Sequence, residues 1–396
     1  MNERPLNILI ISFDRKNIFE DEPIAFRAKL ERDKLRPDFN RFFYFAWSTK
    51  SYHSKPSERL ETVHVKTVWG KFKPYTDFAT WFLVPRALRR HDFKPDVVLI
   101  YDLGYVPAAR KLRRIYGSKI VLGMLNMPRV YSATRQYGLI KSWYSMFLEK
   151  FFLRSIDVYY TINLTMKNYL VDLGARPDKI FIFASDTIER DKANIAAAAK
   201  GRIRQKYGIK ENQKIILSIG RLEAEKGYPE LFGLFSKLEK NFVLIVLGRG
   251  HLEKIFKKLT VSLGIADRAI FAGYASRQEI WNYYADADLF CLLSSAEALG
   301  LVFWESMYMG VPVIGSTASG IAETIGADGE RGFIYDPATD DFEAFNKKVK
   351  QSLEASEERS QRLARAKAYV EAQIANPTTI NDVIPIDNLD NPQTLE

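Results

Sequence analysis

The chain has 396 residues, 47% of them hydrophobic, which is enough for two domains of ordinary size, each with its own core. It contains no apolar run of about 18 residues and no apolar stretch at its start, so we expect a soluble, cytoplasmic protein without a membrane span or signal peptide. The net charge is +10, and the single cysteine, Cys291, excludes a disulfide within the chain.

Short apolar runs of strand length alternate with longer helical patterns in the first half of the chain. These runs cover residues 6–12, 42–46, 62–65, 97–100, 120–125, 158–162 and 180–183. The alternation predicts a parallel sheet with helices on both faces. We therefore expect a first domain over residues 1–188, followed by a polar, alanine-rich linker over residues 189–213.

The alternation of strands and helices then restarts. Apolar runs at residues 214–219, 242–247, 269–271 and 289–293 predict a second domain over residues 214–375, with a helical region from about residue 340 to 373. Residues 376–396 contain three prolines and are expected to be a tail. The fold class is thus α/β, with two doubly wound, Rossmann-like domains that bind ligands at the carboxyl ends of their strands.

Two glutamates with a glycine between them, Glu297, Gly300 and Glu305, follow the run 289–293. Gly300 lies between this strand and a helix expected over residues 301–309. Free N–H groups of Gly300, Leu301 and Val302 would point out of the helix N-terminus and suit a phosphate group. Glu297 before the turn and Glu305 within the helix can both face the same crevice.

This pair resembles the Glu-x7-Glu signature of the retaining glycosyltransferase family four, whose GT-B fold has two such domains facing a central cleft. Segments that match further motifs of the family follow its order: 220–227, 310–315, 319–323 and 332–337. The resemblance implies that Glu305 binds the nucleotide ribose and that Glu297 contacts the transferred sugar. A covalent role for Glu297 is the alternative.

The segment after the strand 214–219 resembles the family's phosphate loop. It begins at Gly220 and contains two cations, Arg221 and Lys226. Transfer from a nucleotide diphosphate sugar requires neutralisation of the leaving pyrophosphate, which Arg, Lys and a helix N-terminus can provide without a metal ion. We therefore expect Arg221 and Lys226 to be catalytic and expect no cofactor.

Three more residues match positions at which the family contacts the nucleotide. Gly248 resembles its second glycine turn, and Gly273 and Tyr274 occupy the place where its backbone meets the base.

Asp286 and Asp288 superficially match the metal-binding Asp-x-Asp of a different transferase fold. They fall between a helix and a strand, so we expect them to bind no metal.

The first domain departs from the family pattern, because the histidine that often follows the fifth strand is missing. Asn126 lies nearest that place, and an amide cannot act as a base near neutral pH. Asp14, Arg15 and Asp102 follow other strands and are further candidates for sugar or acceptor binding. The four histidines show no ligand spacing and are expected to be structural or exposed.

The positive charge is confined to the first half of the chain. Residues 1–183 hold 32 Lys and Arg against 18 Asp and Glu, and residues 103–148 hold eight basic residues, no acidic one and several aromatics. This composition favours binding to an anionic membrane face or to a pyrophosphate-bearing lipid. A solvated basic surface is the alternative, and a nucleic-acid surface lacks any accompanying motif.

Together, these features predict a retaining, metal-independent hexosyltransferase that uses a UDP-sugar or GDP-sugar. The expected acceptor is a glycan or lipid-linked precursor in cell-envelope polysaccharide synthesis, with the enzyme peripheral on the inner face of the membrane. Two other classes stay open: a nucleotide-sugar epimerase on the same fold, and a non-catalytic transferase-like subunit that binds a partner.

Overall fold

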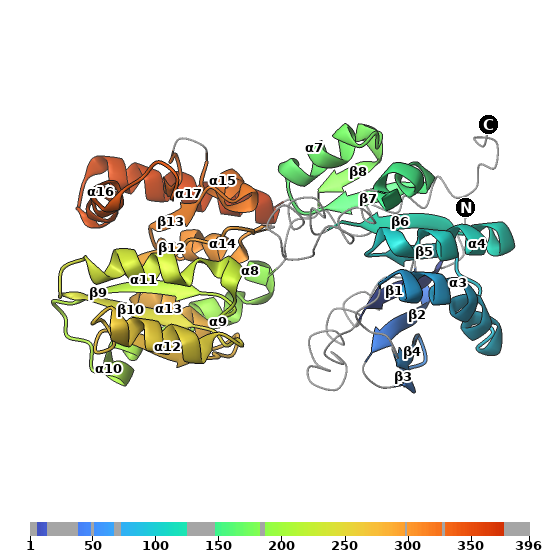
Figure 1. Ribbon diagram of the computed structural model, residues 1–396, viewed down its shortest axis with the longest axis horizontal. Helices are drawn as coiled ribbons and strands as arrows, with labels where there is room; N and C mark the ends of the chain where they lie inside the picture. Colours follow the sequence, from blue (N-terminus) through green and yellow to red (C-terminus); the bar gives the residue numbers. More distant parts are fainter. Residues whose placement is uncertain are drawn as a thin grey trace. The chain divides into compact units, whose positions relative to one another are not determined.

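The computed structural model describes residues 6–13, 39–48, 51–66, 73–124, 147–182, 187–297, 299–326 and 329–375. These residues form two compact units, which we describe separately. The first takes the described residues up to 182 apart from 162–165, and the second takes 162–165 and 187–375. Each has a mainly parallel sheet with helices packed against it, which confirms the predicted doubly wound α/β class (Figure 1).

The first unit has an eight-stranded sheet in the order β3-β4-β2-β1-β5-β6-β7-β8. Its strands are β1 (Leu6–Phe13), β2 (Phe39–Ser48), β3 (Tyr52–Ser57), β4 (Leu60–Lys66), β5 (Val97–Ile100), β6 (Lys119–Gly123), β7 (Val158–Thr161) and β8 (Ile180–Ile182). All neighbours pair in parallel except β3, which is antiparallel to β4. The sequence did not predict β3, because this polar edge strand has one neighbour and needs no apolar run.

Both faces of this sheet are buried, as the strand β2 demonstrates. Phe43 and Phe45 belong to one hydrophobic cluster, whereas Phe42 and Tyr44 belong to a second cluster on the opposite face. The longer helices of the unit are α3 (Lys73–Arg90), α4 (Val106–Tyr116) and most of α7 (Leu164–Asp172), whose first two residues are assigned to the second unit. The 3₁₀ turns are η1 (Leu103–Tyr105), η2 (Leu153–Ser155) and η3 (Pro177–Lys179). Burial on both faces explains why the strands appear as apolar runs without alternation.

The second unit has a six-stranded parallel sheet in the order β11-β10-β9-β12-β13-β14. The strands are β9 (Lys214–Ile219), β10 (Phe242–Leu247), β11 (Ala269–Gly273), β12 (Leu289–Leu292), β13 (Val313–Ser316) and β14 (Phe333–Tyr335). In chain order this is the 3-2-1-4-5-6 arrangement of dinucleotide-binding folds. The order reverses between β9 and β12, and ligands of such sheets bind outside the carboxyl ends of the strands at that point.

The helices of the second unit surround this sheet. They are α8 (Thr187–Arg190), α9 (Lys192–Ala196), α10 (Arg202–Tyr207), η4 (Ala224–Lys226), α11 (Tyr228–Ser236), α12 (Glu253–Ser262), α13 (Ile280–Asp286), α14 (Leu301–Tyr308), α15 (Ser319–Ile325), α16 (Phe342–Leu353) and α17 (Glu357–Ala375). The region expected to be helical from residue 340 to 373 thus divides into α16 and α17, and α17 packs against α14.

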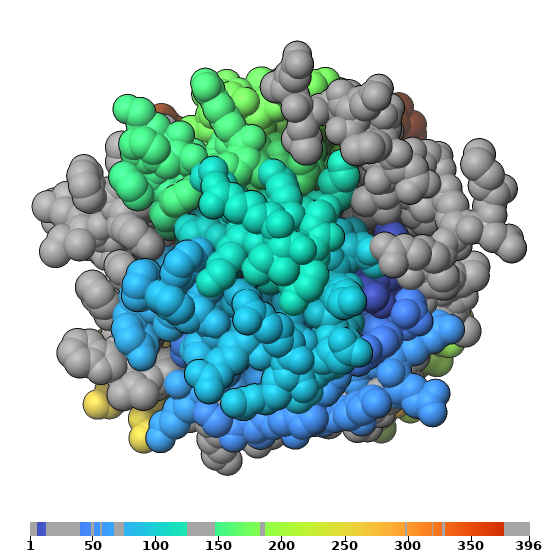
Figure 2. Space-filling model, turned by 90° about the vertical axis from the view of Figure 1, so that its right-hand side faces the viewer, coloured from blue at the N-terminus to red at the C-terminus, as the bar shows by residue number. Residues whose placement is uncertain are grey.

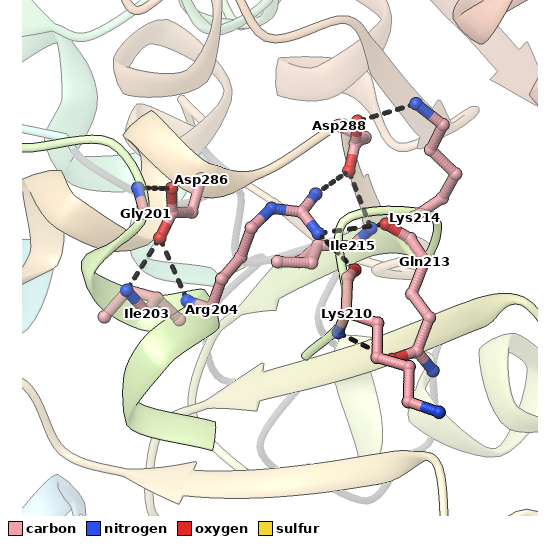
Figure 3. Close-up of polar contacts among 9 residues, drawn as sticks. All are labelled: Gly201, Ile203, Arg204, Lys210, Gln213, Lys214, Ile215, Asp286 and Asp288. Carbon is pink, nitrogen blue, oxygen red and sulfur yellow. Dashed lines mark hydrogen bonds and ion pairs between the residues drawn. The ribbon is translucent and has the colours of Figure 1, made fainter. Parts of the chain in front are cut away.

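Residues 189–213, which we expected to form a linker, instead contribute helices that are fixed to the second unit. The buried carboxylate of Asp286 accepts the N–H groups of Gly201, Ile203 and Arg204, the last two at 2.6 and 3.1 Å (Figure 3). Asp288 adds an ion pair to Arg204 at 2.7 Å. The partners lie more than 80 positions apart in the chain, so local composition could not indicate this packing.

Candidate active site

The loops that follow β9 and β12 interlock at the point where the strand order reverses. Gly227 has φ = +67°, and a Cβ atom there would lie 1.9 Å from the carbonyl oxygen of Leu293 at the end of β12. Only glycine permits that approach. The N–H of Ser295 also donates to the carbonyl of Glu225 at 2.8 Å. The end of η4 is therefore held directly against the residues that lead to Glu297.

This docking brings together two of the predicted site residues. Lys226 Nζ lies 2.5 Å from Glu297 Oε2, and the two side chains are 13% and 18% exposed. The sequence placed them on separate loops of the same sheet edge, 71 residues apart. Their contact joins a cation suited to a phosphate with a carboxylate suited to a sugar hydroxyl, while both retain some access to solvent.

Gly300 begins α14 in the left-handed conformation, with φ = +68°. A side chain would be strained there, and glycine allows the abrupt change from the β12 loop into the helix. Leu301 and Val302 form the first turn of α14, where backbone N–H groups have no intrahelical acceptor. These three residues therefore have the geometry expected of an anion-binding helix N-terminus.

Glu305 is buried and holds two partners that the sequence did not reveal. Its Oε1 lies 2.8 Å from Arg277 Nη1, and its Oε2 accepts the Tyr284 hydroxyl at 2.6 Å. Burial raises the pKa of Glu305, whereas the charge of Arg277 and the hydrogen bond from Tyr284 oppose that rise. A ribose would have to use the remaining lone pairs of this carboxylate or displace Arg277.

Arg277 also connects this carboxylate to the segment before β9. Its Nε donates to Asp191 Oδ2 at 2.7 Å, and the indole N–H of Trp281 donates to the same oxygen at 3.1 Å. Asp191 lies between α8 and α9, so Arg277 links the segment expected to be a linker to Glu305. Nothing in the spacing of Arg277 and Asp191 indicated that they meet.

The other predicted nucleotide residues lie along the carboxyl edge of the same sheet. Gly220 follows β9, and Arg221 is 67% exposed and paired with Glu225 at 3.0 Å. Gly248 follows β10, and its N–H donates to the carbonyl of Gly273 at 2.7 Å. Tyr274 is 64% exposed just beyond β11. Each is thus positioned by a strand end, and Gly220 and Arg221 after β9 lie nearest the point of reversal.

The first-domain candidates are only partly described. Asp102 follows β5, and its carboxylate accepts the N–H of Gly104 at 2.9 Å, which caps η1. Strand β5 is the neighbour of β1, so Asp102 lies beside the reversal of strand order in the first sheet. Asp14, Arg15 and Asn126 fall outside the described residues.

Asp286 and Asp288 are committed to contacts within the protein. Besides Arg204, Asp288 binds Lys214 Nζ at 3.3 Å and the N–H of Ile215 at 2.9 Å (Figure 3). Together with the three N–H groups on Asp286, these contacts give both carboxylates a structural function at the start of β9 and β12. The pair therefore matches a metal-binding Asp-x-Asp in residue type only, because both carboxylates bind groups of the protein.

The histidines were expected to be structural or exposed, and the structure places His53 at the surface and His91 partly buried. His53 and His91 both converge on Glu61 in the first unit, and among the described residues these three form a group that could hold a metal ion. They are too irregularly spaced for a sequence motif, because a hairpin and the end of a long helix bring them together.

Comparison with known proteins covers most of both units. Residues 199–369 match the family described as glycosyl transferases group 1, and residues 48–184 match the glycosyl transferase 4-like domain. Sulfoquinovosyl transferase SQD2 of Arabidopsis thaliana is 25% identical over 258 residues, which are 62% of this chain and 48% of that protein. The alpha-monoglucosyldiacylglycerol synthase of Streptococcus pneumoniae is 28% identical over 180 residues, 44% of this chain and 41% of that one. The chain thus spans less than half the length of these relatives.

Solved structures agree with the fold along nearly the whole chain. Sucrose-phosphate synthase from Thermosynechococcus elongatus superposes with a TM-score of 0.71 at 16% identity, over 93% of this chain and 95% of that one. Anabaena Alr3699/HepE in complex with UDP and glucose gives a TM-score of 0.65 at 16% identity, over 96% and 97% of the two chains. With two matched family segments and this shared architecture, the chain belongs to glycosyltransferase family four and has the GT-B fold.

Proposed function

We propose that this protein transfers a hexose from a UDP-sugar or GDP-sugar to a glycan or lipid-linked acceptor in cell-envelope polysaccharide synthesis, with retention of anomeric configuration. The contact between Lys226 and Glu297, at the reversal point of the second sheet, carries the proposal. In this proposal the second unit binds the nucleotide sugar and the first unit binds the acceptor. Structures of the same fold with UDP and glucose support that donor class.

Each proposed step uses a group already placed on the sheet edge. Arg221, Lys226 and the first N–H groups of α14 neutralise the leaving diphosphate, and Glu305 holds the ribose hydroxyls. The bond between the anomeric carbon and the phosphate oxygen breaks, while a bond to the acceptor oxygen forms on the same face of the sugar. The acceptor proton passes to the departing phosphate oxygen. Glu297 orients the sugar and stabilises positive charge at the anomeric carbon.

Transfer in this mechanism needs no metal ion at the donor site. Two cations and a helix N-terminus already compensate the charge of the pyrophosphate. The carboxylate pair Asp286 and Asp288 lies at the opposite, amino-terminal end of β12 and is occupied by backbone N–H groups and basic side chains of the protein. We therefore expect EDTA to leave the transfer rate unchanged at a temperature well below unfolding.

A surface of the first unit supports a lipid-linked acceptor and a peripheral membrane position. Tyr75, Phe78 and Phe82 follow one another at helical spacing on α3, and their side chains are 41%, 65% and 50% exposed. Helix α4 lies beside α3, with Lys111 Nζ 3.9 Å from the ring centre of Trp81. Figure 2 shows this face, with the light blue of α3 next to the teal of α4.

Aromatic side chains beside basic ones favour the interface of an anionic membrane. Arg110 and Arg114 are exposed on α4. The name of the Streptococcus pneumoniae relative indicates a glycosylated diacylglycerol product, which supports the same acceptor class. No helix among the described residues has the length and apolarity required to cross a bilayer.

The experiment is a donor screen with the full chain, UDP- and GDP-hexoses and lipid-linked acceptors, followed by proton NMR of the freshly formed linkage. We expect one product with the anomeric configuration of the donor. An inverted linkage would contradict the retaining mechanism. Conversion of the donor to its epimer without an acceptor product would favour an epimerase, and donor binding without any turnover would favour the non-catalytic subunit.

A further inference from the structure

A cluster outside the proposed donor site, formed by His53, Glu61 and His91, has the composition of a metal centre. Its ligand atoms all lie within 4.8 Å of one another. Glu61 Oε1 lies 2.8 Å from His53 Nε2 and 2.6 Å from His91 Nδ1, so both imidazoles meet the same carboxylate oxygen. None of the three has a part in the proposed transfer of sugar.

The register of the sheet explains how the three side chains meet. His53 of β3 pairs with Val63 of β4, and Glu61 lies two residues before Val63 on the same face of the strand. Glu61 itself pairs with Phe43 of β2. His91 follows the last residue of α3, with its ring centre 5.6 Å from that of Phe43. Figure 1 shows β3 and β4 at one edge of this sheet.

The carboxylate is buried, oriented and anionic. Arg41 Nη2 lies 3.3 Å from Glu61 Oε2, which directs the other oxygen at the two imidazoles. Glutamate carboxylates are ordinarily ionised at neutral pH, as a metal ligand has to be.

Two imidazoles and one carboxylate form a ligand set that favours zinc over magnesium or calcium, which prefer oxygen ligands alone. Around a tetrahedral zinc with bonds of about 2.0–2.2 Å, ligand atoms lie about 3.3–3.6 Å apart. Each imidazole nitrogen would have to move away from Glu61 Oε1 by roughly 0.5–1.0 Å to reach that spacing. The His53 side chain is 50% exposed on an edge strand, so it has room to rotate.

We propose that His53, Glu61 and His91 form a zinc site in the first unit, with a water molecule in the fourth position. In this site His53 and His91 bind through Nε2 and Nδ1, Glu61 binds through Oε1, and Arg41 keeps the carboxylate in place. The cation connects β3, β4 and the end of α3, so it stabilises the polar edge of the sheet. The site is independent of the donor chemistry.

The test uses the full chain stripped of metal, titrated with Zn²⁺ against a chromophoric competitor and, separately, with Co²⁺ to read its visible ligand-field bands. His53→Ala and Glu61→Gln remove one ligand each and change little of the surrounding packing. His251→Ala is the matched control, since His251 is an exposed histidine in the second unit that also pairs with a glutamate, Glu223. Circular dichroism of the metal-free variants establishes that they are folded.

We expect one Zn²⁺ per chain for the wild type and for His251→Ala. Loss of either ligand should weaken binding by about 100-fold or more, since changes in outer-sphere partners alone cost about 10- to 100-fold. Zn²⁺ should raise the melting temperature of the wild type but not of His53→Ala. Equal affinity in the folded ligand variants and the wild type, or no stoichiometric binding by the wild type, would overturn the proposal. Unchanged transfer in EDTA is expected in either case.

Discussion

The contact between Lys226 and Glu297 depends on a glycine that belongs to neither ionic group. Gly227 lets the η4 turn approach Leu293, and any side chain there would push the two loops apart. Lys226 is mostly buried, whereas Arg221 is 67% exposed and has to leave Glu225 before it can reach a diphosphate. The two cations therefore differ in how far they are organised before the donor binds.

Replacement of either cation should reduce transfer without unfolding the protein. We expect Lys226→Ala and Arg221→Ala each to lower kcat by about 100-fold or more, because each removes a charge-assisted contact to the leaving group. Lys254→Ala, on the exposed face of α12, is the control and should behave like the wild type. Steady-state kinetics measure the effect. Turnover within about threefold of wild type in both variants would contradict the phosphate assignment.

At the scale of elements, the short helix α10 owes its position to Asp286 and Asp288 rather than to its own length. Six residues form too short a helix to be stable alone, and Gly201 at its N-cap provides no side-chain acceptor. Asp286 at the end of α13 substitutes for that cap, and Ile203 of α10 is buried. The segment before β9 thereby becomes part of the second core.

Loss of this cap should destabilise the second unit. We expect Asp286→Ala to lower the free energy of unfolding by about 3–4 kcal/mol, because it leaves backbone donors without an acceptor in a buried position. Asp286→Asn keeps one acceptor oxygen and should lower the free energy of unfolding by roughly half as much as Asp286→Ala does. Denaturant unfolding measures both values. The exposed Asp267→Ala should change stability by less than about 0.5 kcal/mol, and an equally small change for Asp286→Ala would refute a capping function.

At the scale of the whole molecule, charge is divided between the two halves of the chain. Residues 1–183 carry the excess of basic side chains, whereas residues 184–396 hold 26 Lys and Arg against 30 Asp and Glu. Not every cation of α4 is available to a partner. Arg113 donates to the carbonyl of Ser155 at 3.0 Å and pairs with Asp157, and Lys111 donates to the carbonyl of Trp81 at 3.2 Å. Arg110 and Arg114 are exposed.

The protein should sediment with vesicles that contain anionic lipid and should be released as salt rises. Each Lys or Arg near an anionic surface adds about 1 kcal/mol of attraction, screened over roughly 8 Å at physiological ionic strength. Charge reversal at Arg110 and Arg114, or Phe78→Ser with Phe82→Ser, should weaken sedimentation without changing nucleotide affinity.

Charge reversal at Lys254 and Lys258, both exposed on α12 of the second unit, is the matched control and should leave sedimentation unchanged. Equal binding to neutral and anionic vesicles, or binding to neither, would contradict this prediction. The basic residues of α3 and α4 would then form only a solvated surface.

The sequence by itself determined most of the strands and the fold class. The runs 97–100, 214–219 and 242–247 coincide with β5, β9 and β10, because buried parallel strands need continuous apolar residues. It also identified the family, since the motifs that carry the resemblance are contiguous and depend on local backbone geometry, as Gly300 illustrates. The polar edge strand β3 was not predicted, because its sequence has no apolar run that indicates a strand.

Only the tertiary structure decided which side chains meet. Glu297 contacts Lys226, Arg277 covers Glu305, and Asp286 caps α10 across separations of 28 to 85 residues. The meeting of His53 and His91 at Glu61 likewise required a hairpin and the end of a long helix. Hydrophobic periodicity indicates local secondary structure. These contacts depend instead on the order of the strands in the sheet, which no local pattern encodes.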